Sequence, residues 1–230
     1  MPKRIPLLLA ASLAVLAAAS PAGATPIYFY NDPGSARAAF QAAASSLTLE
    51  SFETAFSSAP SVSFPVGGPA AFTLSTSVGN ISRDSFTRLV TDGSFAAAFN
   101  ESPSSTLTFT FSTAIHAFGL DVNDLNFASM SFGDNLGNTL ANALAGDDGG
   151  PAGGPDFQNL QFFGVVNTDA FTTVQLTFTN PSGSSGTIAV DRLEFGGIAA
   201  SAPAVPEPAT LGAAALGLLG LAARRLRRRA

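Results

Sequence analysis

The chain has 230 residues, of which 46% are hydrophobic and only 12% are charged, about half the usual charged share. It contains no cysteine, no tryptophan and one histidine, while 20 phenylalanines supply nearly all of its aromatic content. The lack of cysteine excludes a disulfide scaffold, a thiol enzyme and a cysteine-based zinc site. One histidine excludes a metal site of clustered histidines. So many phenylalanines need burial that the composition argues against intrinsic disorder for most of the chain.

The net charge of −5 hides an uneven distribution. Seven of the 11 basic residues lie among the first four or the last seven positions. Between Thr25 and Val205 there are four arginines and 15 of the 16 acids, so this segment has a net charge of −11. A segment this acidic repels a phosphate backbone, so we expect no nucleic-acid partner.

The N-terminal segment has the order of a secretory signal. Two basic residues precede a mostly apolar run at 5–19, and Ala22 and Ala24 form a small-x-small cleavage site. We predict a signal peptide over residues 1–24, cleaved after Ala24, and therefore an exported protein.

The body, residues 25–200, is long enough for one domain with a sizeable core. Asp32 and Pro33 open an alanine-rich run that continues to Ala44. Aspartate at the N-cap and proline at the first helical position are typical helix starts, so one short helix is predicted there, with Phe40 on its buried side.

The remainder of the body consists of short segments separated by Gly, Pro, Ser and Asn clusters. In 107–111 and 174–178 every second residue is apolar, which is the period of a strand with one buried and one solvated face. Further strands are predicted at 47–52, 71–75, 86–90, 95–99, 115–122, 129–132, 161–166 and 187–195. About ten short strands predict an all-β fold, a two-sheet antiparallel sandwich or jelly roll with phenylalanines between the sheets.

The C-terminal end has three parts. A linker at 201–208 ends in a Pro-Glu-Pro motif, and residues 209–223 carry no charge. Fifteen residues span about 22 Å as a helix, less than a bilayer core of about 30 Å, but flanking arginines can snorkel. We therefore predict a single transmembrane helix at 209–223. The stop signal is an arginine cluster that stays cytoplasmic in the tail 224–230, so the body lies on the outer side: Arg224, Arg225, Arg227, Arg228 and Arg229.

This order of Pro206, Glu207 and Pro208, an apolar helix and terminal arginines resembles the PEP-CTERM sorting signal of exported bacterial proteins. The resemblance implies an exosortase as partner, a membrane-embedded transpeptidase that cleaves near the motif. The protein would be anchored in the inner membrane before processing and then released or transferred to the cell surface. An ordinary tail anchor is the alternative.

The body resembles the jelly-roll-like ectodomains that precede such tails, which look like carbohydrate-binding modules. The matching pieces lie at 49–53, 111–119, 162–166, 171–174 and 188–191. In such modules a Phe-Glu pair near the first strand and an Asp on the last strand often share a structural calcium.

The resemblance therefore implies a Ca²⁺ site at Glu53 and Asp191. Calcium needs six to eight oxygen ligands, so Glu50, Asp32 and backbone carbonyls would have to contribute. The alternative is that these acids are solvated or paired with Arg192.

Other polar residues favour structural interpretations. Asp121 and Asp124 lack the order of an EF-hand loop and indicate a turn with Asx hydrogen bonds. Asp147 and Asp148 open a Gly- and Pro-rich loop. His116 lies between apolar residues of a predicted strand, which is typical of a structural histidine at an edge.

Function follows from these features only in outline. Fifteen acids make a chance glycosidase-like pair common, and no Gly-x-Ser-x-Gly elbow is present. Sugar binding usually uses Trp or Tyr platforms, but the chain has no Trp, and Tyr28 and Tyr30 precede the predicted domain. We expect a non-enzymatic surface or matrix protein with a structural or adhesive role in an exopolysaccharide or biofilm layer. A carbohydrate-binding module that holds a polysaccharide is the alternative, and a glycoside hydrolase is a distant one.

Overall fold

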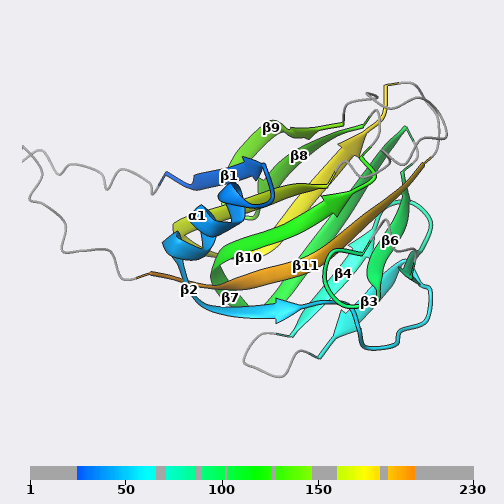
Figure 1. The fold of residues 1–230 in the computed structure, drawn as a ribbon, viewed down its shortest axis with the longest axis horizontal. Helices are drawn as coiled ribbons and strands as arrows, with labels where there is room; N and C mark the ends of the chain where they lie inside the picture. The colour runs from blue at the N-terminus through cyan, green and yellow to red at the C-terminus, as the bar shows by residue number, and fades with distance from the viewer. Residues whose placement is uncertain are drawn as a thin grey trace, which may run out of the picture.

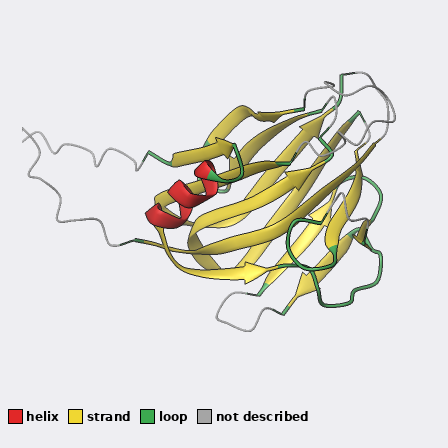
Figure 2. Ribbon diagram, viewed as in Figure 1, coloured by secondary structure: helices red, strands yellow, loops and turns green. Residues whose placement is uncertain are grey.

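A computed structural model describes residues 25–65, 71–85, 90–101, 103–125, 128–146, 160–181 and 186–199 (Figure 1). These residues form strands and a single helix, α1, which lies against the outside of the strands (Figure 2). The elements in chain order are β1 Ile27–Asn31, α1 Ser35–Ala43, β2 Ala44–Glu50, β3 Ser61–Phe64, β4 Phe72–Thr76, β5 Ile81–Asp84, β6 Ala96–Glu101, β7 Ser104–Asn123, β8 Ser129–Asp134, β9 Thr139–Ala145, β10 Gln161–Thr179 and β11 Gly186–Ile198.

Two long strands, β7 and β10, run through both layers of the fold. Phe109 and Phe118 are nine residues apart in β7, which would separate them by about 30 Å on a straight strand. Their ring centroids are instead 5.0 Å apart, so β7 folds back on itself near Ile115. In β10 the register breaks between Val166 and Phe171, where that strand also turns.

The folded strands divide the hydrogen-bonded system into two antiparallel layers. We call sheet I the layer with the order β5-β6-β11-β7-β10-β1, in which β2 continues along β11. Sheet II has the order β3-β4-β7-β10-β8-β9. Sheet I uses 115–123 of β7 and 161–166 of β10, and sheet II uses 104–111 and 173–179.

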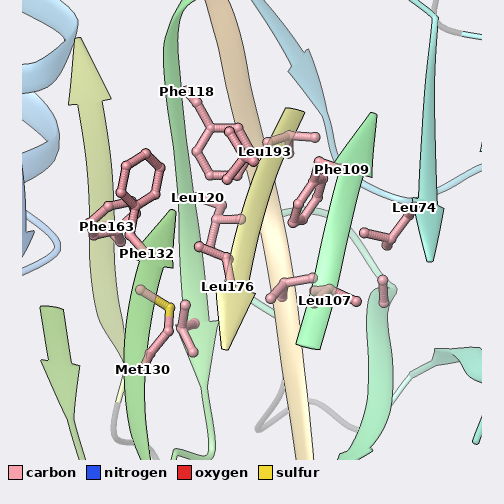
Figure 3. Close-up of a cluster of buried hydrophobic side chains, with 14 of the residues drawn as sticks. Leu74, Leu107, Phe109, Phe118, Leu120, Met130, Phe132, Phe163, Leu176 and Leu193 are labelled. Carbon is pink, nitrogen blue, oxygen red and sulfur yellow. The ribbon is translucent and has the colours of Figure 1, made fainter. Parts of the chain in front are cut away.

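The main core lies between the two sheets and is rich in phenylalanine. Figure 3 shows a part of it, in which phenylalanines pack beside leucines. Phe195 of sheet I packs against Phe72 and Phe111 of sheet II, with ring centroids 5.8 and 5.1 Å apart. Phe99 and Phe178 make a similar contact at 5.1 Å. A buried side chain of this size stabilises the fold by roughly 1.5–3 kcal/mol, so these contacts hold the sheets together.

Helix α1 covers part of the outer face of sheet I. Phe40 is fully buried there against Phe162 and Val166. A Cβ atom on Gly119 or Gly164 would come within 3.0 or 2.9 Å of the Phe40 ring. The two glycines therefore make the space that the phenylalanine fills.

The outer face of sheet II carries hydroxyl groups. Thr73, Thr110 and Thr173 form a row across three strands, because Thr73 pairs with Thr110 and Thr110 with Thr173. Thr106 and Thr177 form a second row, with their hydroxyl oxygens 3.3 Å apart. Threonine suits an exposed strand position, and these rows bear no charge.

The structure confirms the antiparallel sandwich and its one short helix. It differs in the strands, because 107–111 with 115–122, and 161–166 with 174–178, are each one continuous strand. Four strands were not predicted, namely β1, β3, β5 and β9. The predicted strand at 86–90 lies mostly outside the described residues.

The helix starts later than the sequence predicted. Gly34 is its N-cap, and as a glycine it has no side chain that could cap the helix. The Asp32 carboxylate instead accepts hydrogen bonds from the N–H groups of Gly34 and Ser35 and from the Ser35 hydroxyl. These bonds, the hydroxyl foremost, lower the pKa of Asp32.

The prediction that the two tyrosines precede the domain is wrong. Both belong to its edge strand β1. Tyr28 packs edge-on against Phe132 with a centroid separation of 5.7 Å, and Tyr30 is exposed. The predicted transmembrane helix at 209–223 lies outside the described residues. Within the described part of the chain, no helix is long and apolar enough to cross a membrane.

Candidate functional site

Charged side chains gather on the outer face of sheet I, beside helix α1. Arg37 of α1 pairs with Asp121 of β7 and lies 3.7 Å from the Glu194 carboxylate of β11. Glu194 also accepts hydrogen bonds from Gln41 of the helix, at 2.8 and 3.0 Å, and from Arg192 at 3.2 Å. The cluster thus ties α1 to the two central strands of sheet I.

The charged side chains of this cluster are largely buried. The side chains of Asp121 and Glu194 are 1% and 5% exposed, and that of Arg37 is 14% exposed. Burial, together with nearby Arg192, lowers the pKa of Arg37, while Glu194 opposes that shift. A buried charge needs a partner, so each member of the cluster depends on the others.

Asp191 of β11 is the direct neighbour of Asp121 across the strand pair. Its Oδ2 accepts the backbone N–H groups of Thr91 and Asp92 at 2.6 and 2.8 Å, and the Thr91 hydroxyl at 3.2 Å. Its Oδ1 accepts the N–H of Arg192 at 2.7 Å. Burial raises the pKa of the Asp191 carboxyl, and the N–H bonds from Asp92, Thr91 and Arg192 partly offset that rise.

Glu53 binds the same connection between β5 and β6 a few residues later. Its Oε1 accepts the N–H groups of Ser94 and Phe95 at 2.6 and 3.0 Å. The guanidinium of Arg83 lies over the Phe95 ring, 3.1 Å from its centroid, and donates to the Phe52 carbonyl. We call residues 91–95 the latched loop, because Asp191 and Glu53 hold its two halves.

The resemblance predicted that Glu53 and Asp191 share one site, and both bind the latched loop, whereas Glu50 and Asp32 bind elsewhere. Glu50 accepts the N–H of Phe52, and burial raises its pKa. Asp32 sits at the start of α1, bonded to Ser35. Within the described ranges, no group of three or more His, Asp or Glu side chains could hold a metal ion. Oε1 of Glu53 and both carboxylate oxygens of Asp191 accept N–H groups in this structure. Ca²⁺ at Glu53 and Asp191 stays a prediction.

The turn predicted at Asp121 is wrong. Asp121 lies inside β7 and pairs with Arg37, because a buried arginine on the helix needs a buried acid opposite it. The sequence offered one signal for this pair: Arg37 lies three residues before Phe40, on the same face of the helix. His116 is part-buried, and its Nδ1 lies 3.1 Å from the Asn167 carbonyl oxygen, as a structural histidine at the end of the sandwich.

Two cavities border the described residues. One, of about 420 Å³, lies beside the latched loop and is lined by Ser85, Val90, Gly93, Ser94 and Phe95. The other, of about 510 Å³, lies over the β3–β4 hairpin and the adjoining part of β7. Among the described residues that line these cavities there is no acid and no histidine.

Replacing Asp191 by alanine is expected to lower stability by about 1–3 kcal/mol, because the part-buried N–H groups of Thr91 and Asp92 lose their buried acceptor. Burial raises the folded-state pKa of Asp191, so its stabilising contribution is fully present at low pH. That contribution is lost as the pH rises through the folded-state pKa. The destabilisation caused by Asp191→Ala should therefore be larger near about pH 4 than near about pH 7, as measured by thermal unfolding of both chains. A destabilisation that grows with rising pH would contradict this assignment.

The chain carries an export-related sorting signal on an all-β sandwich. Residues 204–229 match the PEP-CTERM protein-sorting motif, which confirms the resemblance drawn from Pro206, Glu207, Pro208 and the terminal arginines. The motif marks an exported protein that is sorted to the cell envelope, and it implies processing by an exosortase. The sequence matches no curated protein.

Among solved structures, the chain is similar to three sugar-related or adhesive domains. A family 11 carbohydrate-binding module from Clostridium thermocellum, in complex with a β-1,3-1,4-mixed-linked tetrasaccharide, is 11% identical over 66% of this chain and 95% of its own, with a TM-score of 0.36. A cleaved adhesin domain of Lys-gingipain is 15% identical over 66% and 98%, with a TM-score of 0.37. The catalytic domain of a GH87 α-1,3-glucanase is 15% identical over 72% and 30%, with a TM-score of 0.37. These scores are too low to argue a shared function.

Proposed function

We propose that this is a non-enzymatic surface or matrix protein with a structural or adhesive role in an exopolysaccharide layer. The carrying observation is the PEP-CTERM motif at 204–229, which follows directly on a folded, strongly acidic sandwich. Sorting to the envelope gives the domain a place at the cell surface. The protein is anchored in the inner membrane before processing and reaches the surface or matrix afterwards.

The contacts of the acids support a role without catalysis. Asp121 and Glu194 hold helix α1, while Asp191 and Glu53 hold the latched loop. A catalytic carboxylate has to reach a substrate. These carboxylates serve instead as anchors within the domain.

The surface of sheet II supports contact with a neutral, hydroxyl-rich polymer. Its rows of threonine hydroxyls can donate and accept hydrogen bonds, and they carry no charge that would be desolvated on contact. The acidic remainder of the domain keeps it soluble and repels anionic partners.

A comparison of three strains tests the proposal. One makes the natural chain, one makes a chain that lacks residues 204–230, and one makes no chain. We expect the truncated chain to leave the cell surface and to weaken biofilm cohesion as much as the missing chain does. Immunoblots of surface fractions and shear resistance of the biofilm measure both effects. Unchanged cohesion without the chain contradicts the proposed role.

The second candidate function is that of a carbohydrate-binding module that holds a specific polysaccharide. The observation in its favour is Tyr30, which is 46% exposed on edge strand β1 and offers an aromatic ring for a sugar face. A glycan array separates the candidates, because a specific module gives one strong class of ligand and a general structural protein gives none.

A further inference from the structure

The chain enters and leaves the sandwich at the same end. Ile27 pairs with Val166, Val166 with Ala117, and Ala117 with Gly196, so the four residues form one row across sheet I. Three strand spacings separate the first from the last, a distance of about 14 Å. Figure 1 shows the start of β1 and the end of β11 on the same side of the molecule.

The bends of both long strands lie at this end as well. The β7 bend exposes Ser112 and Ala114, and the β10 bend exposes Thr168, Asp169 and Ala170. The bends present small or polar side chains with one acid, and the neighbouring row of chain ends adds one exposed large apolar side chain, Ile27, at 55%. Such a surface can lie beside lipid headgroups, and a single isoleucine is far less than the apolar face by which a helix inserts into the bilayer.

Strand β11 is held to the domain up to its last residue. The Ser45 hydroxyl donates to the Ile198 carbonyl at 2.7 Å, and the N–H of Ala199 donates to the Ala43 carbonyl at 3.0 Å. Gly196 lies so close to β2 that a Cβ atom there would come within 2.6 Å of the Ser46 carbonyl oxygen. Within the described residues, the hydrogen bond of Ala199 is the one nearest the C-terminus, and it lies five residues before the sorting motif, which begins at 204.

We propose that this end of the sandwich faces the membrane while the tail is uncleaved, and that the seal of β11 against β2 sets how far the motif stands from the domain. The proposal rests on exosortase processing, as part of the proposed function. Five residues reach at most about 17 Å when fully extended. The processing enzyme must reach the motif without colliding with the domain, so the length of this segment controls the processing rate.

The same orientation determines which end of the sandwich lies away from the membrane. The part of β7 in sheet I runs for nine residues from Ile115 to Asn123, or about 30 Å, away from the row of chain ends. The ends of β7 and β10 that are farthest from the membrane are therefore the ones presented to the surroundings.

A spacer series tests the proposal in cells that process the natural chain. The readout is the fraction of all molecules of the chain that have lost a C-terminal epitope tag. Deleting residues 200–203 should lower that fraction about tenfold or more, because a linker too short to span two sites reduces their encounter nearly to zero. Replacing the same four residues by Gly-Ser-Gly-Ser should leave processing unchanged, since only length matters.

A second substitution distinguishes spacing from recognition. In the shortened chain, Gly196→Val should restore processing, because it opens the seal between β11 and β2 and lengthens the free segment. Normal processing of the shortened chain overturns the proposal, and so does a block that Gly196→Val does not relieve. The double substitution Pro206→Ala and Glu207→Ala serves as the motif control. If that chain is still processed, processing does not depend on the motif, and the proposed function is contradicted as well.

Discussion

Replacing Arg37 by alanine is expected to destabilise the protein by about 3–5 kcal/mol, the usual cost of removing one partner of a buried ion pair. The substitution leaves Asp121 and Glu194, at 1% and 5% exposed, without their shared cation. It also removes the guanidinium that lies 5.1 Å from the centroid of the Phe162 ring. Chemical unfolding followed by circular dichroism measures the change.

Arg192 provides the matched control. It also pairs with Glu194, at 3.2 Å, but its side chain is 33% exposed. Arg192→Ala should therefore cost less than about 1 kcal/mol. Adding Asp121→Ala to Arg37→Ala should recover part of the loss, because it removes one of the buried charges. Equal effects of the two arginine substitutions would show that burial does not set the strength of this cluster.

Replacing Phe40 alone by alanine is expected to lower the free energy of unfolding by about 3–5 kcal/mol, through lost burial and the cavity left behind. Phe40 is fully buried and fills the space over Gly119 and Gly164. Neither glycine has a side chain that could move into the gap, so the site cannot collapse easily. Helix α1 would then be held to sheet I mainly by its polar contacts.

Leu49→Ala is the control for the Phe40 substitution. Leu49 is 49% exposed, so its truncation should change the stability by no more than about 0.5 kcal/mol. Thermal unfolding of both variants beside the natural chain gives the comparison. A Phe40→Ala chain as stable as Leu49→Ala would mean that α1 contributes little to the fold.

Much of the fold could be predicted because period-two patterns are local. Residues 107–111 and 174–178 alternate apolar and uncharged polar side chains, and both segments lie in strands. The short edge strand β5 has only one fully buried apolar residue, Ile81, so it offered no repeating pattern. The bends of β7 and β10 also escaped prediction, because folding back depends on which residues meet across the core.

The candidate site was harder to predict because its partners are distant in sequence. Asp191 binds Thr91, 100 residues away, and Gln41 binds Glu194, 153 residues away. The resemblance to carbohydrate-binding modules implied that Glu53 and Asp191 lie near one another, and both do hold the latched loop. It could not indicate that backbone N–H groups satisfy their oxygens, because those groups exist at every position and become donors only through the loop conformation.

Strand β11 lies between β6 and β7 in the middle of sheet I, although it is the last strand of the domain to be synthesised. Its partner β2 is about 150 residues earlier, so their pairing requires a long loop to close before it gains any stability. Until β11 is made, the chain lacks the strand that joins β6 to β7, so we expect it to fold slowly. A chain that folds late would stay unfolded long enough for export.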